Sequence, residues 1–159
     1  MKLLDLVARD SIIADLRSND RNGCIRELVE CLAAAGRLKA TEVDGIVKSI
    51  VTRERSRGTT AFGKGVAAPH AKVAGLPGPM AAVGRSSRGV DFSSLDGAPV
   101  FGVILLLSPD AEGEQHLRAM DLVFRILQQE RFRKFLKQSD TIDKIFELLE
   151  EADERLPAT

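Results

Sequence analysis

The segment that most limits the fold is the run VFGVILLL at residues 100–107, which contains no polar side chain. An unbroken apolar strand of this kind is typical of a sheet whose two faces are both covered. Eight residues are too few to cross a bilayer as a helix, which needs about 20. We therefore expect a buried central strand with helices packed on both faces, and no membrane insertion.

Helical patterns lie before this strand. Residues 22–35 carry apolar side chains at helical spacing, with Asn19 or Asp20 as the N-cap and Gly36 as the stop. The predicted buried stripe is Ile25, Leu28, Val29 and Leu32.

A second helix is predicted to begin at Thr41, a favourable N-cap, with Asp44 three residues later. Its predicted stripe is Val43, Ile46, Val47, Ile50 and Val51. Gly58 ends it, so Arg53 and Arg55 fall in the last turn, where cations interact favourably with the helix dipole.

The centre and the last third complete the pattern. Residues 80–86 and 99–108 are predicted strands in a region rich in Gly, Pro and small apolar residues. Helices are predicted over 112–129, over 131–138 and after a cap region at 139–141, with His116 in the first turn of the first of them. That helix has the predicted stripe Leu117, Met120, Val123, Phe124 and Leu127. Without a repeat or linker, the chain is predicted to be one α/β domain over 1–159.

Charge and composition exclude several partners. Lys plus Arg and Asp plus Glu number 23 each, so a net charge of zero gives no reason to expect nucleic acid. Trp and Tyr are absent, which argues against a base-stacking platform. The opening MKLLDLVARDS has charges where a signal peptide needs apolar residues, so we expect a cytoplasmic protein.

Two cysteines, Cys24 and Cys31, lie seven residues apart in the first predicted helix. That spacing places their backbones roughly 10 Å apart, too far for a disulfide bond. We expect both to be small core residues.

His70, in GVAAPHAK, is one of only two histidines, and its role has several alternatives. Too few ligands at metal-binding spacing accompany it, so we expect no metal. The chain has no G-x-S-x-G elbow for a serine nucleophile, and Gly65 replaces the Ser or Thr that a nucleotide-binding loop needs after Lys64. We therefore expect no nucleotide cofactor.

A phosphoryl acceptor fits the surroundings of His70. A neutral imidazole is a competent nucleophile, and Arg53, Thr60 and the glycine-rich backbone before Pro69 are available to stabilise phosphoryl oxygens. Structural alternatives stay open at this point. His70 can be a buried core histidine, His116 a solvated helix residue, and Arg53 only a cation at a helix end.

Three stretches in combination resemble a known family. RERSRGTTAFGKGVAAPH, PVFGVILLLSP and HLRAMDLVFRIL are similar to the enzyme IIA domains of the fructose/mannitol family of the bacterial phosphoenolpyruvate-dependent phosphotransferase system, which includes the nitrogen-regulatory IIA proteins. The resemblance covers nearly the whole chain and implies a central mixed sheet with helices on both faces. Ala68 and Ala71 depart from residues common in the family at these positions.

The resemblance also implies roles for four residues. His70, which ends the Pro-His motif, would be phosphorylated, and Arg53, in the Arg-Glu pair, would contact the phosphoryl group. His116, in the His-Leu pair, would be a second active-site histidine, and Thr60 a further phosphate-binding residue.

Two functions follow from the resemblance. The protein would carry phosphate from phospho-HPr to a cysteine on a separate IIB protein, or it would be a regulatory protein whose phosphorylation state controls partner binding. The 159 residues contain no IIB or IIC segment, which favours the regulatory type. The sequence predicts neither the sugar nor the oligomeric state.

Overall fold

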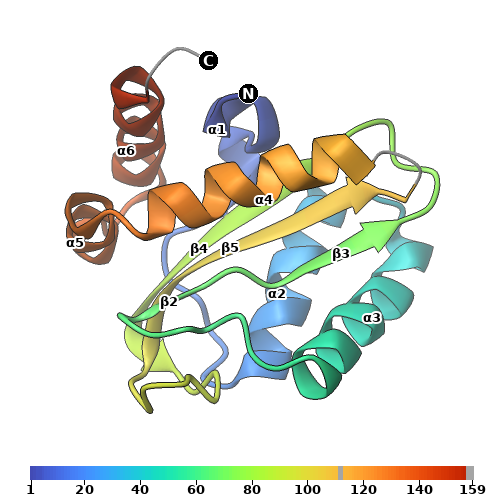
Figure 1. Ribbon diagram of the computed structural model, residues 1–159, viewed down its shortest axis with the longest axis horizontal. Coiled ribbons are helices and arrows are strands. Elements are labelled where there is room, and N and C mark those ends of the chain that lie inside the picture. The colour runs from blue at the N-terminus through green and yellow to red at the C-terminus, as the bar shows by residue number, and fades with distance from the viewer. Residues whose placement is uncertain (111–112, 157–159) are drawn as a thin grey trace.

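The computed structural model describes residues 1–110 and 113–156. Its centre is a five-stranded mixed sheet (Figure 1). The strands are β1 (Ile12–Ile13), β2 (Val66–Ala67), β3 (His70–Val73), β4 (Met80–Val90) and β5 (Val100–Pro109). β4 and β5 are antiparallel, β1 runs parallel to β4, and both β2 and β3 run parallel to β5 along its other edge. The predicted central strand is therefore β5.

Helices cover both faces of this sheet, as predicted (Figure 1). α2 (Arg21–Ala34) and α3 (Val43–Ser56) pack on one face. The other face carries α1 (Leu3–Leu6), α4 (Gly113–Leu127), α5 (Glu130–Gln138) and α6 (Ile142–Arg155). Among the described helices, none combines the length and apolar character that crossing a bilayer would need.

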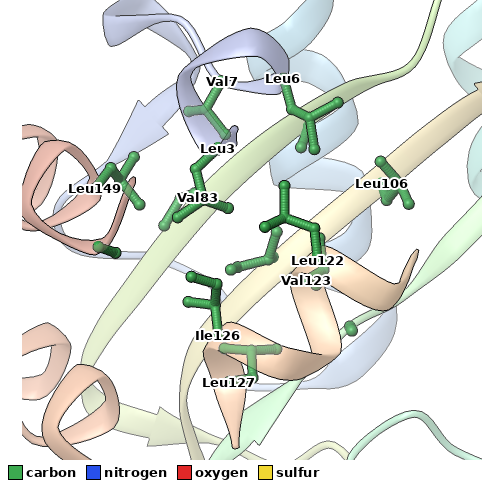
Figure 2. Packing of buried hydrophobic residues seen from close by; sticks show 14 of the residues in the cluster. Leu3, Leu6, Val7, Val83, Leu106, Leu122, Val123, Ile126, Leu127 and Leu149 are labelled. Atoms are coloured by element: carbon green, nitrogen blue, oxygen red, sulfur yellow. The ribbon is translucent and has the colours of Figure 1, made fainter. Parts of the chain in front are cut away.

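The two faces have separate apolar cores because side chains alternate along β5. Ile104 and Leu106 point to the α4 side, whereas Leu105 and Leu107 point to the α2 and α3 side. Figure 2 shows the α4-side cluster, which contains Leu106 together with side chains from α1, β4, α4 and α6. Because β3 pairs with β5, the same alternation determines which residues of β3 face α4.

The ends of α2 and the carboxyl-terminal end of α3 agree with the sequence prediction. Asp20 caps α2 by accepting a hydrogen bond from the Gly23 N–H, and Gly36 follows its end with a φ of 77°. Arg53 and Arg55 lie in the last turn of α3, and Gly58 follows with a φ of 91°.

The predicted Thr41 cap is wrong. A 3₁₀ turn, η2 (Ala40–Glu42), precedes α3, and the N-cap of α3 is Glu42. The Glu42 carboxylate instead accepts a hydrogen bond from the Lys39 N–H at 3.1 Å, so the chain turns early and Thr41 lies inside the turn.

The predicted stripe of α4 is wrong at one position, because Leu117 is 69% exposed. The buried face is formed by His116, Ala119, Met120, Leu122, Val123, Ile126 and Leu127. Leu117 and Phe124 are seven residues apart and therefore point in nearly the same direction from the helix axis. The buried face is centred to one side of that direction, so Phe124 is only partly buried. Glu112, within the predicted helix, lies outside the described residues.

The two cysteines are free, as expected, but their burial differs. Cys24 is fully buried, and burial raises the pKa of its thiol to about 12. Cys31 is only partly buried, and its thiol donates to the Asp10 carbonyl oxygen at 3.4 Å. The prediction of a core residue holds for Cys24 alone, since Cys31 is only partly buried.

Candidate functional site

The site forms where the start of β3 and the last residues of β5 meet the start of α4. In the parallel pair, His70 lies opposite Leu106 and Lys72 opposite Ser108. Paired residues share a face of the sheet, and Leu106 faces α4. His70 therefore points toward α4. The next residue, Ala71, packs on the opposite face, as the alternation along a strand requires.

The structure brings the two predicted histidines together. Their ring centroids are 5.8 Å apart, with 47° between the ring planes. His70 is the first residue of β3, and His116 lies in the first turn of α4. Their residues are 7% and 8% exposed, so both rings are largely removed from solvent.

The tautomer of His70 follows from its hydrogen bond. Nδ1 lies 2.9 Å from the carbonyl oxygen of Ala68. A carbonyl can only accept, so Nδ1 carries the proton and Nε2 keeps its lone pair. Burial lowers the pKa of His70, and the positive charge of Arg53 lowers it further, against the opposing effect of the Ala68 hydrogen bond. The ring is therefore neutral at pH 7.

His116 has a different partner. Its Nδ1 lies 2.8 Å from the hydroxyl oxygen of Ser108 on β5. Its pKa is lowered mainly by burial, then by electrostatic interaction with the neighbouring His70 ring, and then by the positive charges of Lys72 and Arg53. Both imidazoles are therefore neutral and lie within the field of two side-chain cations.

Arg53 lies in the last turn of α3, near enough to influence this site electrostatically. It is partly buried, and its charge acts on both histidines. Within residues 1–110 and 113–156, it forms no ion pair with a carboxylate, so its donors are not committed to one. The neighbouring Arg55 is exposed.

Thr60 is held by a buried carboxylate that the sequence predictions did not include. Glu54 is 3% exposed, and it accepts hydrogen bonds from the Thr60 N–H at 2.7 Å and the Thr60 hydroxyl at 2.8 Å. Burial raises the pKa of Glu54, whereas the two Thr60 hydrogen bonds and the Arg21 and Arg53 charges lower it. Since the Thr60 hydroxyl proton is directed at Glu54, direct phosphate binding by this residue stays a prediction.

Glu54 and Ser108 are polar residues at positions that the apolar patterns assign to the core, and these positions can be recognised in the sequence. Glu54 continues the buried stripe of α3 four residues after Ile50. Ser108 continues the α4-facing series of β5 two residues after Leu106. A polar side chain at a position that alternation or helical spacing assigns to the core needs a partner, because burying an unpaired polar group is unfavourable.

A separate pocket of about 220 Å³ lies beside the second half of α4. Phe62 and Phe124 lie on its wall with ring centroids 5.6 Å apart, and Thr60 also lines it. Neither histidine belongs to its lining. The histidine pair therefore lies outside this pocket.

The fold places the chain among solved IIA structures. A nitrogen-regulatory IIA protein from Neisseria meningitidis superposes with a TM-score of 0.79 over 91% of this chain and 97% of its own, at 24% identity. The mannitol IIA of Escherichia coli superposes with a TM-score of 0.72 over 90% of this chain and 98% of its own, at 20% identity. The mixed sheet covered by helices on both faces is thus the IIA fold.

Sequence comparison gives the family. The model of the phosphoenolpyruvate-dependent sugar phosphotransferase system, EIIA 2, matches residues 5–152. The chain belongs to this family of phosphotransferase-system IIA domains.

Two relatives differ in their own length. A nitrogen regulatory protein of Bradyrhizobium diazoefficiens is 35% identical over 94% of this chain and 95% of its own length. A fructose-specific EIIABC component of Bacillus subtilis is 31% identical over 96% of this chain, which spans only 24% of that relative.

Proposed function

We propose that this protein is a phosphoryl carrier of the phosphotransferase system that accepts the phosphoryl group on Nε2 of His70. The observation that supports this most directly is the hydrogen bond between His70 Nδ1 and the Ala68 carbonyl oxygen. It leaves an unprotonated Nε2 on a neutral ring, the form in which histidine attacks phosphorus.

In the transfer step, the Nε2 lone pair forms a bond to phosphorus while the bond from phosphorus to the donor nitrogen breaks. The donor ring keeps that electron pair. Positive charge then develops on the His70 ring, and the Ala68 carbonyl oxygen stabilises it through the Nδ1–H. Transfer onward to a cysteine thiolate reverses these roles, and Nε2 recovers its lone pair.

The surrounding groups stabilise the charge of the phosphoryl oxygens. Arg53 supplies a planar set of N–H donors at the end of α3, and His116 supplies a ring nitrogen from α4, the helix that His70 faces. Lys72, two residues along β3, adds positive charge on the same face. Thr60 remains a proposed phosphate-binding residue, and its contact with Glu54 holds the chain after α3.

The donor and the acceptor are proposed to be proteins. Phospho-HPr is the proposed donor, and a cysteine of a separate IIB protein is the proposed acceptor. The mannitol IIA of Escherichia coli, which shares this fold, is known in complex with phosphorylated IIB. The exposed Leu117 beside His116 leaves an apolar surface next to the proposed site.

A regulatory role is the second candidate, and one observation favours it. The nitrogen regulatory relative is 35% identical to this chain, whereas the fructose relative is 31% identical. In this alternative, His70 is phosphorylated in the same way, and the phosphorylation state decides which partner the protein binds.

The test is labelling with phosphoenolpyruvate, enzyme I and HPr. We expect one acid-labile phosphoryl group per chain, since a phosphoramidate hydrolyses in acid and a phosphoserine does not. His70→Gln should abolish the label, and persistent labelling of that variant would overturn the proposal. Subsequent addition of a IIB protein separates the two candidates, because only the sugar-transporting carrier passes the label to it rapidly.

A further inference from the structure

Ser108 is the penultimate residue of β5 and is completely buried. We propose that it is the positioning residue of His116: its hydroxyl donates to Nδ1, so that Nε2 carries the proton and presents an N–H to the phosphoryl group on His70. This inference rests on the proposed function of His70. It assigns to Ser108 a role that neither the motifs nor the family match provides.

The direction of the hydrogen bond follows from the partners of the serine. The Ser108 oxygen lies 2.8 Å from His116 Nδ1, and among the described residues it has no other hydrogen-bond partner. If Nδ1 carried the proton, the serine proton would be buried without an acceptor. If the serine donates, both groups are satisfied, so the second arrangement is favoured.

The strand register gives Ser108 this position. Along β5, alternate residues face α4, and the apolar side chains of Ile104 and Leu106 pack there. Ser108 is the next residue of that series and lies opposite Lys72 on β3. Packing alone does not require a hydroxyl at this point, whereas the imidazole on α4 does.

The result is a pair of histidines with opposite tautomers. Ala68 places the proton of His70 on Nδ1 and leaves Nε2 as the nucleophile. Ser108 places the proton of His116 on Nε2 and makes that nitrogen a donor. Without the serine, His116 is free to adopt the other tautomer, in which Nε2 presents a lone pair and repels a phosphoryl oxygen.

Nitrogen NMR tests the tautomers directly, because two histidines give only four ring-nitrogen signals. In the unphosphorylated wild type at pH 8, we expect a protonated Nδ1 and a bare Nε2 on His70. We expect a bare Nδ1 and a protonated Nε2 on His116. His116→Ala assigns the signals to each ring, and a protonated Nδ1 on His116 would overturn the proposal.

Transfer rates test the consequence. Ser108→Ala should slow phosphorylation of His70 by roughly ten- to a hundredfold, by analogy with the loss found when the outer hydrogen-bond partner of a metal-ligating histidine is removed. Ser108→Thr keeps the hydroxyl and should restore most of the rate.

Ser11→Ala is the matched control, since Ser11 is also fully buried and its hydroxyl has no partner among the described residues. A Ser108→Ala rate equal to that of Ser11→Ala would contradict the positioning role. If Ser108→Ala does not fold, the wild-type spectrum still decides. A wild type that takes no label at all would instead overturn the proposed function of His70.

Discussion

The Nδ1 atoms of His70 and His116 are held by two different partners, the Ala68 carbonyl oxygen at 2.9 Å and the Ser108 hydroxyl at 2.8 Å. Ala68 lies in the link between β2 and β3, and Ser108 lies on β5, while the rings themselves come from β3 and α4. Each ring is thereby oriented independently of the other, although their centroids are only 5.8 Å apart.

Replacing His116 should slow phosphoryl transfer without moving the site of phosphorylation. His116→Ala removes one donor near the phosphoryl group, and loss of such a donor typically costs roughly a hundredfold or more in rate. His70 should still become labelled given time, which a time course with peptide mapping will show. Transfer at the wild-type rate would make His116 a helix residue without a role in the reaction.

Replacing Arg53 by lysine should slow transfer by roughly tenfold or more, because lysine keeps the charge but loses the planar arrangement of donors. Circular dichroism on the same sample should show an unchanged fold. Arg55→Lys is the matched control, since Arg55 lies in the same last turn of α3 and is exposed. Equal rates for the two variants would reduce Arg53 to a cation at a helix end.

Both histidines should titrate below the ordinary histidine pKa of 6.5. Burial lowers the pKa of each, and the cations that face them are Arg53 on α3 and Lys72 on β3. As the pH falls through 6.5, the unfolded chain binds protons first, so folding stability should decrease from there down to the folded pKa values.

Proton NMR of the two rings gives these midpoints, and a midpoint above 6.5 would contradict the account. After phosphorylation, the negative charge beside His116 should raise its pKa. The same titration on the phosphorylated protein checks that sign.

Removing the Thr60 hydroxyl should destabilise the domain. Glu54 is buried and accepts two hydrogen bonds from Thr60, so Thr60→Val leaves part of a buried carboxylate unpaired. We expect the free energy of unfolding to fall by about 1–3 kcal/mol. Thr52→Val on the exposed side of α3 is the control, and equal denaturation midpoints for the two variants would exclude a structural role for the Thr60 contact.

The long elements were predictable from the sequence because their patterns are strong. β5 is an unbroken apolar run, and α2 and α3 carry regular stripes that end at Gly36 and Gly58. The short strands β1, β2 and β3 have two to four residues each, too few for a periodic pattern. Their pairing with β4 and β5 is a tertiary effect.

The site was predictable in part for the same reason. Motifs identify His70, Arg53 and His116 as residue types at a characteristic spacing, but only the register of β3 against β5 places His70 on the α4 face. Glu54 and Ser108 have no motif, and their importance becomes visible through the partners that burial demands. Leu117 was misplaced because helical spacing fixes which residues share a face, not which face packs on the sheet.

The most direct measurement is the identification of the phosphorylated nitrogen. The protein is labelled with ¹⁵N at its histidines, phosphorylated through enzyme I and HPr, and examined by NMR for coupling between ³¹P and a ring nitrogen. Because Nδ1 of His70 is tied to the Ala68 carbonyl oxygen, the coupling should appear at Nε2 of His70 and at no nitrogen of His116. Coupling at Nδ1 of His70, or at either nitrogen of His116, would contradict the account.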